Sequence, residues 1–224
     1  ALQMALLAEG VGPGDEVITT GFTFVATINT ILSVGAIPVL VDINPQTNNI
    51  DHNLIEQYVS KKTKAIMPVH LYGLSSDMSK IEIIARKYDL KIIEDACQSL
   101  GAEFDGQKVG TFGIGCFSFY PTKNITTGEG GMICTNDEEL YEKFLLIRNH
   151  GMGLTRYDYR ALGYNFRMTN IQAALGIGQL ERIDELLISR IKNANIYDGK
   201  LKKLLSVPYS NLKYKHVYNQ YTIK

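Results

Sequence analysis

The chain has 224 residues, which is enough to bury a sizeable core in one large domain. Its 23 lysines and arginines balance its 23 aspartates and glutamates, and no basic block is interleaved with aromatic residues, so we expect no nucleic-acid partner. No window approaches the roughly 18 to 20 uninterrupted apolar residues of a membrane span, and three scattered cysteines make no disulfide scaffold. We therefore expect a cytoplasmic protein without membrane contact.

The first residues, ALQMALLAEG, have helical spacing but neither a cap nor an initiator methionine. We expect residue 1 to lie inside a helix that begins upstream. Strands are then predicted at EVITT, IPVLVDI, KAIMPVHLY and LKIIEDA, and helices at TFVATINTILSVGA, DHNLIEQYVSKK and SDMSKIEIIARKYD. Thr23 is the predicted N-cap of the first of these three helices, and Gly35 its C-terminal stop. This alternation indicates a largely parallel sheet covered by helices on both faces.

Beyond the next strand, GIGCFSFY, the chain becomes helical. DEELYEKFLLIRNHG predicts one helix, and a long helical pattern runs from about Thr169 to Leu205. The predicted buried stripe of this long helix consists of four apolar residues, Ile171, Leu175, Ile183 and Leu187. SVPYSN ends the helix, and a further unit begins near Tyr209. Its last residues, HVYNQYTIK, are predicted to form a strand.

The chemically interesting side chains follow the predicted strands. In parallel sheets, ligands bind outside the carboxyl ends of the strands. The residues at these ends are His70 and Tyr72, Asp95 and Gln98, and the run from Ser118 to Lys123. We therefore expect the functional site at this edge of the sheet.

Lys123 stands in SFYPTKNITTGEGG, between an apolar strand and a loop of threonines and glycines. Most lysines are exposed and protonated, and an isolated loop lysine would be no candidate. A lysine held against an apolar wall, in contrast, loses its proton more easily and attacks carbonyl groups. Pro121 stiffens the approach to Lys123, and we expect backbone amides of Thr126–Gly131 to face an anion.

Asp95 ends the strand LKIIEDA. Opposite a pyridine nitrogen, its carboxylate would keep that nitrogen protonated and make the ring an electron sink. The alternative is an aspartate that caps the next turn through Ser99 and Gly101. Glu94 is a second candidate for the same role, but side chains alternate along a strand, so only one of the two carboxylates can face a ligand.

Several other kinds of site lack their sequence patterns. H-E-x-x-H and Cys/His clusters are absent, so a metal site has no support. G-x-S-x-G and the P-loop pattern are absent too, and TTGFTF after the first strand is not the G-x-G-x-x-G of a dinucleotide-binding domain. Schiff-base chemistry at Lys123 is the interpretation that remains strongest.

These residues resemble the DegT/DnrJ/EryC1/StrS family of nucleotide-sugar aminotransferases, which depend on pyridoxal phosphate. The matching stretches are GDEVITTGFTFVAT, PVHLYG, IIEDACQSLGAEFDGQKVGTFG, CFSFYPTKNITTGEGGMI, RNHGM and LGYNFRMTNIQAALGIGQLERI. The resemblance implies an α/β, aspartate-aminotransferase-like fold (fold type I). Residues 1–205 would be the large cofactor-binding domain without its N-terminus, and residues 206–224 the start of a truncated small domain.

The resemblance also implies the roles of individual residues. Lys123 would hold pyridoxal 5′-phosphate as a Schiff base and later shuttle a proton. Asp95 would pair with the pyridine nitrogen, and Gln98 would hydrogen-bond the phenolic oxygen of the ring. Phe24 would stack on the ring, although its alternative is an ordinary core residue in the first helical turn.

Two further residues are implied to hold the cofactor phosphate. Ser118 would bind it from the same subunit, and Asn165 would reach it from the partner subunit, so that a homodimer shares its active sites. Considered without the family, Asn165 and Arg167 are ordinary polar residues before a helix. Tyr120 stands where many members have histidine, and the family's upstream Gly-Thr turn has no counterpart in the sequence.

The implied reaction moves an amino group from L-glutamate to a keto group of a nucleotide-linked deoxysugar. A 4-keto sugar, as used by perosamine-type synthases of surface-polysaccharide pathways, is the expected substrate. One alternative is a sugar dehydratase of the same family, but such enzymes commonly carry histidine in place of Lys123. Another is a non-catalytic sugar-binding or regulatory relative, whose sign would be loss of the lysine or of Asp95.

Overall fold

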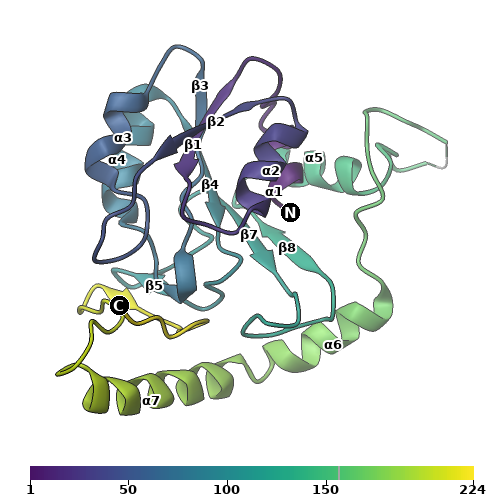
Figure 1. Cartoon of the computed structure of the whole chain (residues 1–224). Coiled ribbons are helices and arrows are strands. Elements are labelled where there is room, and N and C mark those ends of the chain that lie inside the picture. Colours follow the sequence, from purple (N-terminus) through teal and green to yellow (C-terminus); the bar gives the residue numbers. More distant parts are fainter. Residues whose placement is uncertain (156) are drawn as a thin grey trace.

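The centre of the protein is a six-stranded sheet of order β2-β1-β3-β4-β7-β8 (Figure 1). The computed structural model describes residues 1–155 and 157–224. Five strands are parallel: β1 (Glu16–Thr20), β2 (Ile37–Val41), β3 (Thr63–Ile66), β4 (Lys91–Asp95) and β7 (Ile114–Ser118). The sixth, β8 (Gly131–Cys134), pairs with β7 in antiparallel orientation. The mostly parallel sheet is thus confirmed, while β8 was not predicted.

Helices cover both faces of this sheet, as predicted. One face packs against α1 (Leu2–Ala8), α2 (Ala26–Ser33) and α5 (Glu138–Arg148), and the other against α3 (His52–Ile55) and α4 (Met78–Tyr88). The alternation of strand residues separates the two cores. Val17 packs into the first core, and its neighbour Ile18 packs into the second.

Two predicted helices differ in detail from the structure. Thr23 is not a helix cap, because α2 begins only at Ala26. The pattern over residues 51–62 gives only α3 and the 3-10 turn η1 (Glu56–Tyr58), since Val59 already has an extended backbone. The stop at Gly35 is confirmed: it follows α2 with φ +81°, the left-handed conformation that glycine adopts most readily.

The long helix predicted from Thr169 to Leu205 is wrong at its middle. The structure has α6 (Asn170–Leu180) and α7 (Ile183–Leu201), and between them Arg182 leaves helical geometry. Both helices lie below the carboxyl ends of the strands (Figure 1). They split because they pack on different neighbours: α6 on the loop before β8, and α7, through Leu187, on a third apolar cluster.

The predicted buried stripe of this region holds only in α7. Leu187 is buried and Ile183 is partly buried, whereas 77 % of Ile171 and 54 % of Leu175 are exposed. The reason is that α6 turns a different face inward. Gln172 and Gln179 hydrogen-bond to the loop before β8, and Gly176 faces the same loop so closely that a Cβ there would lie 3.1 Å from Thr127 Cγ2.

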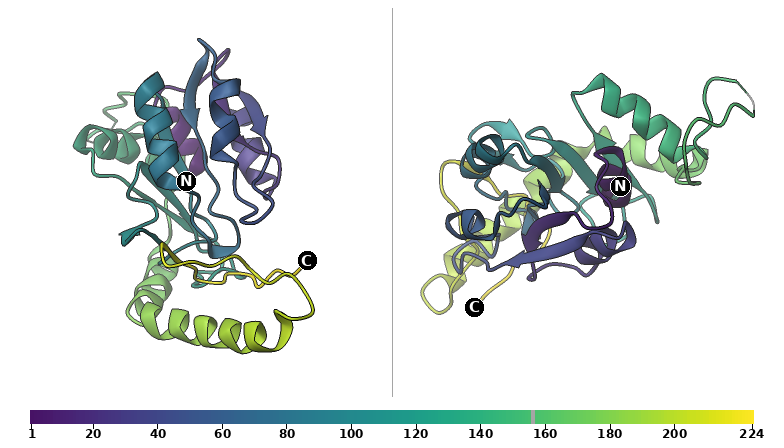
Figure 2. Two further views of the ribbon diagram at one scale, coloured as in Figure 1. Left: turned by 90° about the vertical axis from the view of Figure 1, so that its left-hand side faces the viewer. Right: turned by 90° about the horizontal axis from the view of Figure 1, so that it is seen from above.

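The last residues pass between α7 and the sheet, as the left view of Figure 2 shows. The predicted strand over residues 216–224 is wrong, because the strand β9 consists of Tyr214–Lys215 alone. It pairs with β5 (Glu103–Phe104), which also pairs with β6 (Gln107–Lys108). A last 3-10 turn, η2 (Leu71–Gly73), lies against this segment, where Val217 N donates to Gly73 O. The division into domains at residue 206 stays a prediction.

Membrane association through a spanning helix finds no support in residues 1–155 and 157–224. No helix there combines the length and the apolar character that crossing a bilayer requires.

Gly115→Ala should strongly destabilise the fold. A Cβ at this position in β7 would come within 2.4 Å of Gly110 Cα and 2.6 Å of Gly110 O, so backbone would have to move in the core. We expect the free energy of unfolding to fall by about 3 kcal/mol, measured by urea denaturation. Gly199→Ala in α7 is the matched control, because its Cβ would meet nothing within 4 Å, and it should be neutral or gain up to about 1 kcal/mol. Equal effects of both substitutions would contradict the packing.

Acid should destabilise the protein through His216. This side chain is 6 % exposed, and burial lowers its pKa from 6.5 to about 4. The unfolded chain therefore binds a proton first as the pH falls, so stability is lost between about pH 6.5 and pH 4 and nothing is gained above that window. The loss attributable to this one group amounts to about 3 kcal/mol. His216→Gln should flatten this part of the curve of unfolding free energy against pH, and an unchanged slope would contradict the assignment.

Candidate active site

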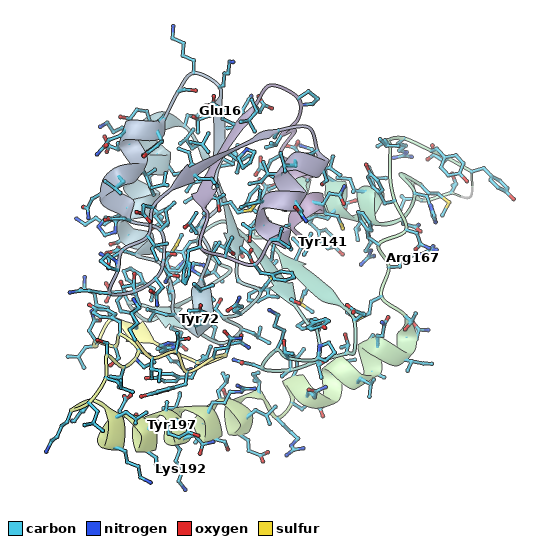
Figure 3. All side chains as sticks on the ribbon, viewed as in Figure 1. Glu16, Tyr72, Tyr141, Arg167, Lys192 and Tyr197 are labelled. Atoms are coloured by element: carbon cyan, nitrogen blue, oxygen red, sulfur yellow. The ribbon has the colours of Figure 1, made fainter. Side chains whose placement is uncertain are left out.

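The polar residues predicted from the strand ends do gather at the carboxyl edge of the sheet. Glu16 marks the beginning of β1, and Tyr72 lies at the opposite end of the sheet, beside the C-terminal segment (Figure 3). Asp95 is the last residue of β4, and Ser118 is the last residue of β7. Parallel strands thus bring residues that are distant in sequence to one edge.

Asp95 is 6 % exposed, and the Thr27 hydroxyl and the Cys97 amide orient its carboxylate. Thr27 Oγ1 donates to Oδ2 at 2.7 Å, and the amide of Cys97 donates to Oδ1 at 3.3 Å. The alternative role of capping through Ser99 and Gly101 is not observed, since Ser99 Oγ donates to Ala96 O instead. Asp95 therefore belongs to the side of the sheet that α2 covers.

Glu94 points to the opposite face, as strand alternation predicted, and is fully buried. Its carboxylate accepts hydrogen bonds from the amides of Gly110, Phe112 and Gly113 at 2.7 to 3.0 Å and from His70 Nε2 at 3.0 Å. Because Ser76 N donates to His70 Nδ1, the ring carries its proton on Nε2 and is neutral. Glu94 and His70 thus form a structural group, and Asp95 alone is available at the site.

Gln98 is half-buried, and its carboxamide orientation is defined by the backbone. The amide of Tyr72 donates to Gln98 Oε1 at 2.9 Å, so the NH₂ group of Gln98 is the end left to donate. Tyr72 adopts φ +59°, an uncommon conformation for a bulky residue that often accompanies functional sites. Its ring packs edge-on against Phe22 with centroids 6.5 Å apart.

Lys123 is half-buried in a turn in which its amide donates to Tyr120 O at 3.0 Å. Within residues 1–155 and 157–224, its ammonium has neither a hydrogen bond nor an ion pair. Asn219 Nδ2 holds the turn on both sides of the lysine, at Thr122 O and at Asn124 Oδ1. The backbone of Lys123 is therefore fixed while its amine is available.

The thiol of Cys97 lies in the electrostatic field of both predicted catalytic groups. Burial raises the pKa of Cys97 well above its ordinary value, and the charge of Asp95 and a hydrogen bond with it raise the pKa further. The Lys123 ammonium acts in the opposite direction. Cys97 therefore stays a neutral thiol that both Asp95 and Lys123 influence electrostatically.

Ser118 lies beside a cavity of about 840 Å³ that Cys97, Ala26 and Thr30 also line. The hydroxyl of Ser118 accepts from Tyr120 N at 3.3 Å. The prediction that loop amides face an anion fails for three residues. The amide of Thr126 donates to Gln179, that of Thr127 to Phe119 O, and that of Gly128 to Thr126 Oγ1.

Phe24 is 69 % exposed and lies two residues before the start of α2. The alternative of a core residue is therefore wrong, and the ring is free to meet a ligand. The carbonyl of Phe24 accepts from Thr27 N at 3.1 Å, which ties the aromatic to the residue that orients Asp95.

Asn165 is not brought to this group. It lies in an arm formed by residues 149–155 and 157–168, which projects from the body in Figure 1 and in the right view of Figure 2. Asn165 pairs with Asn149 in an isolated antiparallel bridge and accepts from Arg167 Nε at 3.1 Å. Arg167 itself is seen on the irregular segment that leads from the arm to α6 (Figure 3).

Sequence reasoning missed Thr27, the residue with the shortest contact to Asp95. The signal was present, because Thr27 belongs to the matching stretch GFTFVAT, but a threonine in a helical pattern has no chemistry of its own. A metal site finds no structural support either: the described part of the chain has no group of three or more His, Cys, Asp or Glu that could hold an ion.

Similar proteins were found over the whole chain, which spans about three fifths of the length of the curated relatives it matches. It is 47 % identical to a GDP-perosamine synthase of Caulobacter vibrioides, with 100 % of this chain and 62 % of the relative covered. It is equally identical, with the same coverage, to a "pleiotropic regulatory protein" of Geobacillus stearothermophilus. A UDP-2-acetamido-2-deoxy-3-oxo-D-glucuronate aminotransferase of Pseudomonas aeruginosa is 44 % identical over 100 % of this chain and 63 % of its own.

Solved structures show the same likeness. DesV of S. venezuelae, crystallised with a ketimine intermediate, superposes with a TM-score of 0.96 at 34 % identity, covering 99 % of this chain and 61 % of that one. An aminotransferase from Brucella abortus gives a TM-score of 0.96 at 38 % identity, covering 100 % and 62 %. The family model of the DegT/DnrJ/EryC1/StrS aminotransferases matches residues 1–224. The chain belongs to the DegT/DnrJ/EryC1/StrS aminotransferase family.

Proposed function

We propose that the protein is a pyridoxal-phosphate-dependent aminotransferase that moves an amino group from L-glutamate to the keto group of a nucleotide-linked deoxysugar. The observation that carries the proposal is that an oriented Asp95 ends β4, while the half-buried Lys123, which follows β7, has an amine without a hydrogen bond or ion pair among the described residues. The names of relatives that act on GDP- and UDP-linked sugars support the substrate class. The 4-keto position follows the perosamine synthases, and the cytoplasm is the proposed compartment.

The residues present fit pyridoxal phosphate. Asp95 Oδ2 is held by Thr27 and Oδ1 by a longer bond to Cys97 N, and each carboxylate oxygen has a second lone pair with which to accept from a pyridinium N–H. Gln98 offers its NH₂ group for the phenolic oxygen, Phe24 an exposed ring for stacking, and Ser118 a hydroxyl for the phosphate. When bound, the cofactor supplies an electron sink for the charge that develops on the donor carbon.

The chain's own groups would divide the work as follows. Lys123 Nζ would bind the aldehyde carbon of the cofactor with loss of water. Once the donor's amine has displaced it, the Lys123 amine would take the proton from the donor's α-carbon and return it to the cofactor carbon. The Asp95 carboxylate keeps a positive charge on the ring nitrogen, which stabilises the developing negative charge. The half-buried setting of Lys123 limits the access of water to its amine.

We further propose that two copies of the chain share their active sites and that Asn165 of one copy reaches the phosphate held by the other. The exposed apolar residues of the arm support such a partner: Leu154 is 98 % exposed, Leu162 80 % and Tyr159 61 %. Large exposed apolar side chains that gather in one region are typical of protein interfaces. Within one chain, Asn165 contacts the arm rather than the site.

A regulatory or non-catalytic role is the second candidate, because one relative with 47 % identity is named a regulatory protein. Retention of both Lys123 and Asp95 favours the enzyme. A sugar dehydratase of the same family is a third candidate, and it differs from an aminotransferase in making a product without the donor's nitrogen.

Lys123→Ala should abolish covalent cofactor binding. The full-length protein with added pyridoxal phosphate should absorb visible light, lose that band on addition of L-glutamate, and show neither response after the substitution. Turnover should fall roughly a thousandfold or more, because nucleophile and proton carrier are lost together. Lys108→Ala, at an exposed position of β6, is the control and should behave as the wild type. A wild-type protein that stays colourless would refute the proposed function.

The substrate is best identified with ¹⁵N-labelled L-glutamate and a panel of GDP- and UDP-linked 4-keto and 3-keto sugars, read by mass spectrometry. We expect a 4-keto sugar to gain one labelled nitrogen while glutamate becomes 2-oxoglutarate. Labelling of 3-keto sugars alone would overturn the 4-keto assignment. An unlabelled deoxygenated product would identify a dehydratase, and binding without any turnover would favour the regulatory role.

A further inference from the structure

The segment Thr23–Thr27 contains two threonine hydroxyls that lead to the predicted ring-nitrogen partner. Thr27 Oγ1 lies 2.7 Å from Asp95 Oδ2, and Thr23 Oγ1 lies 2.9 Å from Thr27 Oγ1. Thr27 is 1 % exposed, so water does not compete for its hydroxyl. The three groups form a continuous hydrogen-bonded chain from the loop before α2 to the end of β4.

Proton counting gives this chain a direction. A threonine hydroxyl has a single hydrogen, and that of Thr27 is given to Asp95 Oδ2. The contact between the two threonines can therefore be made only by the hydrogen of Thr23. Each bond in such a chain polarises the next, so the donation of Thr23 strengthens that of Thr27 to the carboxylate.

We propose that Thr27 is a positioning residue that aims the Asp95 carboxylate at the ring nitrogen of the cofactor, and that Thr23 supports it. The inference rests on the proposed function. One lone pair of Oδ2 is taken by Thr27, and the amide of Cys97 holds Oδ1 through a longer contact of 3.3 Å. Without the Thr27 hydroxyl, the carboxylate keeps this longer bond and the weak donor of the Cys97 thiol, and it loses its shortest hydrogen bond.

The same segment carries the aromatic that is proposed to stack on the ring. Thr27 N donates to Phe24 O at 3.1 Å, so the exposed ring of Phe24 and the hydroxyl of Thr27 belong to one tight turn. A single rigid unit thus sets both the face that covers the ring and the charge that meets its nitrogen. Thr27 links the two through its backbone and its side chain.

Thr27→Val and Thr27→Ser separate the hydroxyl from the shape of the side chain. Valine keeps the volume and removes the donor, whereas serine keeps the donor. We expect Thr27→Val to weaken pyridoxal phosphate binding roughly ten- to hundredfold, as for loss of a hydrogen bond to a charged group. With the ring nitrogen labelled, its ¹⁵N chemical shift should move towards the unprotonated form. Thr27→Ser should resemble the wild type in both measurements.

Thr19→Val is the matched control. Thr19 is also fully buried, and its hydroxyl donates at 2.8 Å, but to Met67 O in the sheet. Thr19→Val should lower thermal stability as much as Thr27→Val does, and it should leave the ¹⁵N chemical shift of the ring nitrogen unchanged. Thr23→Val, at a less buried position, should move the shift in the same direction as Thr27→Val but by less, and it serves also if Thr27→Val does not fold.

The outcomes distinguish this inference from the proposed function. A wild-type protein that binds no pyridoxal phosphate overturns both. If the wild type is coloured but Thr27→Val and Thr23→Val keep the wild-type nitrogen shift and cofactor affinity, the positioning role alone is overturned. A shift that moves equally in Thr19→Val would assign the effect to general destabilisation and overturn the positioning role as well.

Discussion

The buried carboxylate of Glu94 accepts hydrogen bonds from neutral donors and thereby joins the parts of the chain that surround the site. Three backbone amides of the turn at residues 110–113 and the neutral ring of His70 all donate to it. The turn can approach this closely because Gly110 and Gly113 lack a Cβ, which would come within 2.4 Å of Phe117 and 2.3 Å of Ile92, respectively. The hydrogen bonds of Glu94 thereby tie the carboxyl end of β4 to the start of β7 and to the segment that follows β3. The three neighbouring strands are held together at this point.

This constraint also determines what Asp95 does. Successive residues of a strand point to opposite faces, so holding Glu94 on the face of α3 and α4 leaves Asp95 on the face of α2. There Thr27 meets it at 2.7 Å. A slip of one residue in β4 would exchange the two carboxylates. Glu94, which accepts four hydrogen bonds, would then face the site, and Asp95 would lie in the core. The structural role of Glu94 and the proposed chemical role of Asp95 therefore both depend on the register of β4.

The sequence predicted those features that rest on local patterns. The strands EVITT and LKIIEDA stand out because apolar runs between turn residues leave few alternatives, and alternation along LKIIEDA was enough to separate Glu94 from Asp95. Contacts between distant segments could not be predicted in this way. The role of Thr27 depends on α2 packing beside the end of β4, and the loop amides that were expected to face an anion are taken by Gln179 and Phe119. Strand β8 consists of only four residues, too few for a periodic signal.

The failed prediction for α6 has a physical explanation that bears on the partner subunit. Apolar residues at helical spacing normally mark the buried face of a helix. In α6 the inward positions are instead Gln172, Gly176 and Gln179, which lie along one face and hold the loop that contains the residues after Lys123. The apolar residues Ile171 and Leu175 consequently point to solvent. A helix with this inverted arrangement exposes apolar area that the described residues of one chain leave uncovered. The requirement that fixes the lysine loop thus adds exposed apolar residues to those of the arm, on which a second copy is proposed to dock.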